Sequence, residues 1–198
     1  MPESTYYIKY SVAALFDRYH INDKRKTHIL STAHEMVRFA DRFSLDTEQA
    51  YIAGVFHDIA RDMPHETIID LSKRFGHLQN ELESENPKLL HAYASAQIII
   101  EENITSDSEI IQAVASHTTG AAEINTLGIL LYVLDFAEPL RSYPEAAVAY
   151  QKLQDNLYEA AFYVVTETWN MLIEKRRPIH HSSIDFYNYL VFLLKNIR

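Results

Sequence analysis

Four glycines and six prolines in 198 residues are too few for the many tight turns of a β-rich protein, so long helices are expected. Between Arg25 and Phe43, apolar residues recur with the spacing of one helical face. Asp46 suits the N-cap of a following apolar helix, and Ser106 with Glu109 forms a capping-box pattern for another. These patterns predict an all-α fold.

Longer segments set the expected organisation of the chain. Residues 145–174 are predicted to form one long helix, and the polar residues 77–88 a loop. Ser182 is a candidate cap for the last helix, and Arg176 with Arg177 is interpreted as an exposed helix end. No internal repeat or linker divides the chain, so residues 1–198 are expected to form a single helical domain.

Composition excludes several functional classes. A formal charge of -9 argues against partners such as a nucleic-acid polymer or a membrane surface, which attract basic patches. The absence of cysteine excludes disulfides and thiolate metal sites, and it fits a cytoplasmic protein. The opening MPESTYYIKYS lacks the basic and apolar regions of a signal peptide.

A scattered set of histidines and aspartates lies in or beside apolar segments that otherwise suit a core. Burying such groups singly is costly, but a shared metal ion would satisfy all of them. Imidazole and carboxylate ligands suit iron, manganese, cobalt, nickel or zinc, bound as one ion or two. Asp58 has a short carboxylate that could bridge two ions. The predicted ligands are His28, His57, Asp58, His91, His117 and Asp135.

The other histidines have simpler interpretations. His34 follows His28 by six residues, which turns it to a different face of the helix. His20, His65 and His77 lie in polar surroundings and are expected to be solvated.

The order of these residues, with their neighbours, resembles the HD-domain metal-dependent phosphohydrolases, and most closely the YqeK-type symmetrical diadenosine tetraphosphate hydrolases. The similarity extends from about residue 20 to 190. It is carried by Arg25 with His28, His57-Asp58-Ile59-Ala60-Arg61, Leu89-Leu90-His91, His117-Thr118-Thr119-Gly120, Asp135-Phe136-Ala137-Glu138-Pro139-Leu140-Arg141 and Pro178-Ile179-His180.

The resemblance implies a single HD-domain helical bundle, with helical extensions at both ends, that cleaves diadenosine tetraphosphate to two ADP using a metal-activated water. It implies a divalent transition metal, with iron first among the candidates. His28, His57, Asp58 and Asp135 would hold one ion; Asp58, His91 and His117 would hold a second. Asp58 and Arg61 are the catalytic candidates. The substrate-binding candidates are Arg25, Arg61, His91, His117, Thr118, Thr119, Arg141, Pro178, Ile179 and His180.

The chain departs from the family pattern at four positions. Ile29 follows the first histidine where a small hydroxyl residue is common, and Leu140 replaces a small residue before Arg141. His181 stands for a usual proline and Tyr187 for a usual arginine, which bears on nucleotide contacts of the last helix. All six metal-ligand positions are retained.

Three alternatives remain open at this point. The same metal site could act on another nucleotide, as a phosphohydrolase or phosphodiesterase. A catalytically silent HD protein could bind nucleotide and regulate a partner, and a metal-free helical adaptor is the remaining alternative. The resemblance also leaves a homodimer open as the assembly.

Overall fold

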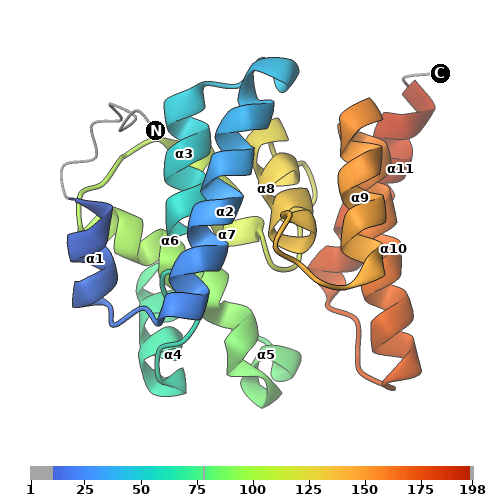
Figure 1. Ribbon diagram of the computed structural model, residues 1–198. Coiled ribbons are helices and arrows are strands. Elements are labelled where there is room, and N and C mark those ends of the chain that lie inside the picture. Colours follow the sequence, from blue (N-terminus) through green and yellow to red (C-terminus); the bar gives the residue numbers. More distant parts are fainter. Residues whose placement is uncertain (1–10, 78, 197–198) are drawn as a thin grey trace.

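A computed structural model describes residues 11–77 and 79–196, and the opening segment tested for a signal peptide lies mostly outside these ranges. The described residues form helices without strands, as the all-α prediction required (Figure 1). The α-helices are α1 (Val12–Arg18), α2 (Asp23–Ala40), α3 (Thr47–Phe56), α4 (His65–Arg74), α5 (Glu81–Glu85), α6 (His91–Glu101), α7 (Ser108–Ser116), α8 (Thr126–Ala137), α9 (Pro144–Asp155), α10 (Leu157–Glu174) and α11 (His181–Asn196). Short 3-10 helices cover Asp41–Phe43 and Pro87–Leu90.

Side-chain caps determine where several helices begin. Asp46 accepts hydrogen bonds from the backbone N–H groups of Glu48 and Gln49, as predicted. The Ser106 cap is wrong: Asp107 caps α7, and its carboxylate also accepts a hydrogen bond of 2.7 Å from the Gln49 side chain. Asp107 thus connects α7 to α3, and a contact with a distant helix cannot be predicted from a local capping pattern.

Three further predictions about helix limits are wrong. Residues 145–174 form two helices, because Asn156 is extended and its side chain caps α10. The predicted loop 77–88 contains α5, which Asn80 and Glu83 start with a capping box. Ser182 does not cap α11; its backbone N–H instead donates to Nδ1 of His180 at 3.2 Å.

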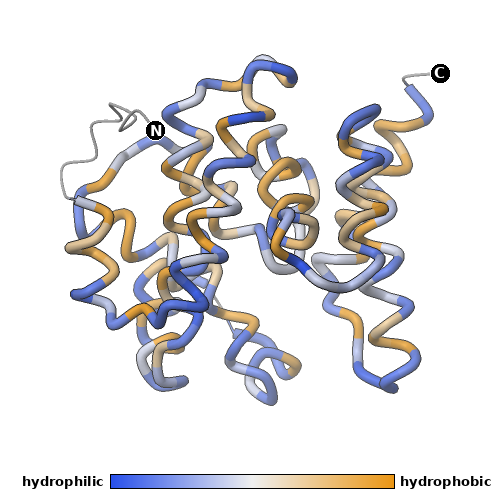
Figure 2. Tube along the Cα trace, in the orientation of Figure 1, coloured by the Kyte–Doolittle hydropathy of each residue, from blue (hydrophilic) through white to orange (hydrophobic). Residues whose placement is uncertain are grey.

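Helix α8 lies at the centre of the fold, between α2, α3 and α7 on one side and α9 and α10 on the other (Figure 1). Every residue from Leu127 to Leu134 is buried, so this helix is apolar on all faces. Figure 2 shows apolar residues recurring along α8, whereas the turns at the outer ends of the molecule are hydrophilic. Of the helices in the described ranges, none has the length and apolarity needed to cross a membrane.

Candidate metal centre and cavity

The six predicted ligands sit at helix ends that converge on one buried region. His28 lies near the start of α2 and His91 begins α6, whereas Asp135 lies near the end of α8. His57 and Asp58 directly follow α3, and His117 directly follows α7. Five of them are buried, and the Asp135 side chain is 27% exposed.

The first ligand group joins His28, His57, Asp58 and Asp135. The Nε2 atoms of His28 and His57 are 3.2 Å apart. Oδ1 of Asp135 lies 3.0 Å from Nε2 of His28 and 3.6 Å from Nε2 of His57. Helices α2, α3 and α8 therefore bring together residues more than a hundred positions apart.

The second group joins Asp58, His91 and His117. The Nε2 atoms of His91 and His117 are 3.0 Å apart, and Oδ1 of Asp58 lies 3.0 and 3.6 Å from them. Oδ2 of Asp58 instead lies 3.7 Å from Nε2 of both His28 and His57. The Asp58 carboxylate thus faces one group with each oxygen, as a bridging ligand would.

Hydrogen bonds to backbone carbonyls define the tautomer of three imidazole rings. A carbonyl oxygen only accepts, so each Nδ1 carries the proton and each Nε2 presents a lone pair. Facing lone pairs about 3 Å apart repel unless a cation lies between them. The donor set therefore fits divalent metal ions. The bonds are His57 to Gly54 at 2.8 Å, His91 to Lys88 at 2.7 Å and His117 to Val114 at 2.7 Å.

His28 is oriented by a carboxylate instead of a carbonyl. Its Nδ1 lies 3.2 Å from Oε1 of Glu138, which is 2% exposed. Glu138 also accepts hydrogen bonds from the Ser31 hydroxyl at 2.6 Å and the Leu140 backbone N–H at 2.8 Å. Glu138 belongs to the Asp135 motif, but sequence reasoning assigned it no role. The sequence offered as a signal only its place three residues after a predicted ligand, since its burial is a property of the packed structure.

The charges of these side chains also suit a cation. Burial opposes ionisation of Asp58, but the neighbouring imidazoles, His57 foremost, hold its pKa well below the usual range. Burial also opposes ionisation of Asp135, but His28 and His57 hold its pKa well below the usual range. Burial lowers the pKa of His57, and it lowers that of His91 to about 4. The site thus offers ionised carboxylates together with neutral imidazoles at His57 and His91.

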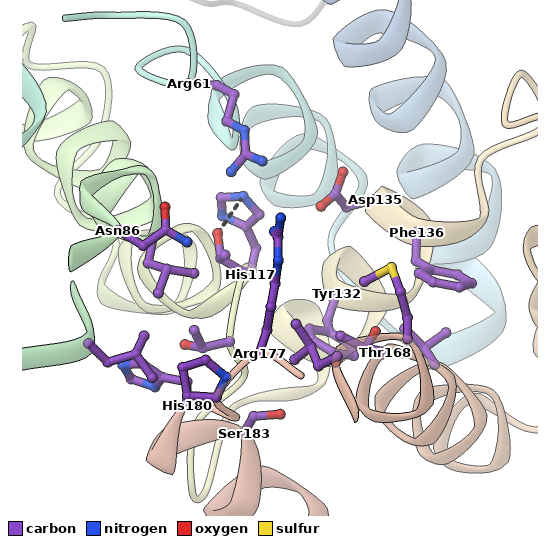
Figure 3. A pocket seen from close by; sticks show the side chains of 18 of the residues that line it. Arg61, Asn86, His117, Tyr132, Asp135, Phe136, Thr168, Arg177, His180 and Ser183 are labelled. Carbon is purple, nitrogen blue, oxygen red and sulfur yellow. Dashed lines mark hydrogen bonds between the residues drawn. The ribbon is translucent and has the colours of Figure 1, made fainter. Parts of the chain in front are cut away.

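A cavity of about 720 Å³ opens beside the ligands and extends to α10 and the start of α11 (Figure 3). Arg61, Arg141 and Arg177 line it, together with apolar side chains such as Tyr132 and Leu172. A concave site that combines cations with apolar walls can hold an anionic ligand that also carries a flat apolar group.

Most predicted substrate-binding residues lie at this cavity. Arg141 lines it and binds Asp135, with 2.9 Å between Nη2 and Oδ1. The Arg61 guanidinium lies against the His91 ring, 2.9 Å from Nδ1. The Thr118 hydroxyl lies 3.2 Å from Nε2 of His91. The other predicted residues that line the cavity are His117, Thr119, Pro178 and His180.

Three predicted substrate-binding residues are not among the described residues that line the cavity: Arg25, His91 and Ile179. Arg25 donates a hydrogen bond to Oδ2 of Asp58 and lies 3.3 Å from Asp62, so its guanidinium is already paired with carboxylates. Arg25 therefore contacts the predicted ligand Asp58 and is not among the described residues that line the cavity.

One interpretation of a polar residue is incomplete and another is wrong. Arg176 and Arg177 are exposed just after α10, as predicted, but Arg177 also lines the cavity. His77 is not free in solvent: Nε2 lies 2.9 Å from Oε2 of buried Glu83, and its ring stacks on Tyr93. Glu83 lies only six residues after His77, whereas Tyr93 belongs to α6. His20 and His65 are exposed as predicted, and His34 is exposed whereas His28 on the same helix is buried.

The four departures from the family pattern have ordinary surroundings. Ile29 is fully buried in the core, whereas Leu140 is 61% exposed. The His181 ring stacks on His180 at 4.3 Å, and Tyr187 packs against Trp169 of α10 at 4.9 Å. Tyr187 therefore takes part in packing between α10 and α11.

The fold and the site define a class of protein: a helical domain whose histidines and aspartates fit a divalent metal site, with one carboxylate facing both ligand groups. The chain belongs to the HD domain family, whose model matches residues 25–139. Helices α9 to α11 follow this match, and the prediction that residues 1–198 form one domain stays a prediction.

Similar proteins cover nearly the whole chain. A protein of Bacillus subtilis (strain 168) named symmetrical bis(5'-nucleosyl)-tetraphosphatase is 29% identical over 174 residues, covering 86% of this chain and 91% of that protein. A protein of the same name from Staphylococcus aureus is 28% identical over 180 residues, covering 89% and 91%. The crystal structure of a predicted HD superfamily hydrolase involved in NAD metabolism from Clostridium acetobutylicum superimposes with a TM-score of 0.86, at 28% identity, covering 92% of this chain and 98% of the other.

Proposed function

We propose that this protein hydrolyses diadenosine tetraphosphate symmetrically to two ADP. The observation that carries the proposal is the position of Asp58, with one oxygen toward each ligand group, beside a cavity lined by three arginines. The names of the relatives from B. subtilis and S. aureus support the same substrate.

Two metal ions fit the donor groups that the chain provides. His28, His57, Asp58 and Asp135 would hold one ion, and Asp58, His91 and His117 the other. When bound, such ions polarise phosphate oxygens and lower the pKa of water toward neutrality. We propose iron as the native ion, which elemental analysis of the purified protein would test.

The chain's own residues would bind the substrate, orient the metal ligands and neutralise the phosphate charge. Arg61 and Arg141 would contact phosphate oxygens, since a guanidinium binds them bidentately. The Thr118 hydroxyl, next to the second ligand group, can donate a further hydrogen bond. Glu138 positions His28, and Arg25 positions Asp58 through the hydrogen bond between them. Pro178 and His180 line the cavity where a nucleoside would lie.

Product analysis tests the reaction. The purified protein with Fe, Mn or Co should convert diadenosine tetraphosphate to ADP alone, and AMP plus ATP would reject the symmetrical cut. His28→Ala should abolish turnover, whereas His34→Ala, on the exposed face of the same helix, should not change it. Equal rates in His28→Ala and the parent would reject the enzyme and leave a nucleotide-binding regulator.

Two expectations from the sequence accompany this proposal. We propose that the protein acts in the cytoplasm, on the ground that it contains no cysteine. A homodimer stays a prediction, which light scattering after size-exclusion chromatography would measure.

A further inference from the structure

The turn after α10 gives Arg177 a defined backbone position. The Arg176 backbone is left-handed at φ 52°, and its N–H donates to the Ile173 carbonyl at 3.0 Å. The Arg177 N–H donates to the Leu172 carbonyl at 2.8 Å, which completes the two hydrogen bonds of a Schellman motif. Pro178 follows and restricts the Arg177 backbone to extended conformations. Local hydrogen bonds therefore reverse the chain at this residue.

The reversal directs the Arg177 side chain back to the cavity. Arg177 lines the cavity, and Figure 3 shows its guanidinium extending toward the region of Arg61, His117 and Asp135. Both arginines are exposed, but Arg176 is not among the described residues that line the cavity. Two adjacent arginines thus have different surroundings.

Among the residues that the structure describes, Arg177 has no acidic partner, unlike Arg25 and Arg141, and unlike Arg61 its guanidinium is not held against a ligand imidazole either. Arg25 binds Asp58, and Arg141 binds Asp135. No hydrogen bond or ion pair joins the Arg177 guanidinium to another residue in the described part of the chain. An uncompensated guanidinium in a concave site attracts an anion, even in a chain with a formal charge of -9.

We infer that Arg177 is a specificity-determining residue that binds the phosphates of the ADP half of the substrate lying in the cavity. This inference rests on the proposed function. Arg177 extends from the wall formed by Tyr132 and Ser183 toward His117 and Asp135. It is therefore placed to contact the phosphates of the ADP half that lies in the cavity. It belongs to the segment after residues 25–139, outside the part that the HD domain model matches.

The test compares Arg177→Gln with Arg176→Gln, because the two variants lose the same charge from adjacent positions. Arg177→Gln should raise the KM for diadenosine tetraphosphate and the Kd for ADP by about 10- to 100-fold, since each hydrogen bond to a charged group contributes strongly. Its kcat should stay within about threefold, since Arg177 contributes to binding more than to the chemical step. Arg177→Lys should lie between the parent and Arg177→Gln, because Lys keeps the charge without the bidentate geometry.

Calorimetry with ADP and with adenosine separates phosphate binding from nucleoside binding. Arg177→Gln should weaken ADP binding and leave adenosine binding unchanged. An equal loss for both ligands, or equal behaviour of the two glutamine variants, would overturn the inference. If the parent binds ADP through Arg177 but does not cleave diadenosine tetraphosphate, the proposed function fails and the phosphate contact stands. Thermal unfolding of both variants verifies that they fold.

Discussion

Gly54 of α3 packs directly against Ala33 of α2, and these two helices position His28 and His57 of the first ligand group. A Cβ at this position would lie 2.5 Å from the Cα of Ala33 on α2, whereas ordinary contact begins at 3.4 Å. The nearest atom belongs to the backbone, so no side-chain rotation relieves the overlap. In Gly54→Ala the helices α2 and α3 must therefore separate by about 1 Å, as dense packing requires.

The separation has two expected consequences. Overpacking of a tight interface costs roughly 1–3 kcal/mol, which in a chain of this size corresponds to a fall in Tm of roughly 2–12 °C. The movement also widens the gap of 3.2 Å between Nε2 of His28 and Nε2 of His57, because one lies on each helix. We expect the Kd for Mn²⁺ to rise by about 10- to 100-fold, as when a supporting group of a metal site is lost.

Circular dichroism in EDTA measures the stability change, and calorimetric titration with Mn²⁺ measures the affinity. Gly76→Ala is the matched control: Gly76 has φ 91° but nothing within 4 Å of an added Cβ, so the variant should lose stability without losing Mn²⁺ affinity. Adding Ala33→Gly should not rescue Gly54→Ala, since the Ala33 Cα remains. Unchanged Tm and Mn²⁺ affinity in Gly54→Ala would refute the reasoning.

Three further predictions concern the metal and pH. Asp58→Asn weakens both ligand groups, so metal content and turnover should each fall about a hundredfold or more, and retention of both ions on elemental analysis would contradict the bridging role. Mn²⁺ at about a thousandfold excess over Kd should stabilise the fold by about 4 kcal/mol and raise Tm by roughly 8–16 °C in differential scanning calorimetry, and EDTA should reverse this. Burial opposes ionisation of Glu83, but the Asn80 backbone N–H and His77 hold its pKa below its ordinary value of 4.5. The stability that Glu83 contributes is therefore complete above pH 4.5 and lost as the pH falls through the lowered pKa, so Glu83→Gln should flatten this acid limb in urea titrations. An unchanged limb would exclude the Glu83 contribution.

Interactions within a few residues were predictable from the sequence. The helical class followed from periodicity and from the scarcity of glycine and proline, and the Asp46 cap followed from its local hydrogen-bonding capacity. The six ligands were identifiable because each places a polar group at the end of an apolar segment, in the order of a known family. Burial without a partner would be costly for each of them.

Contacts between distant segments were not predictable in this way. The break at Asn156 depended on whether its side chain capped a new helix or pointed to solvent, and both choices satisfy the same helical periodicity. Glu138 lies against His28 of α2, and Glu83 lies against His180, which is 97 residues away, so these contacts required the packed structure.

The sequence by itself determined the helical class and which side chains have the chemistry to bind a metal, because periodicity and side-chain chemistry are local properties. Only the tertiary structure decided that Asp58 faces both ligand groups and that Arg177 turns into the cavity. It also explains the glycine of the His117 motif: Gly120 has φ 70°, and a Cβ there would collide with the ring of Phe186 on α11. These outcomes depend on how helices distant in sequence pack, and packing geometry is a property of all the contacts together.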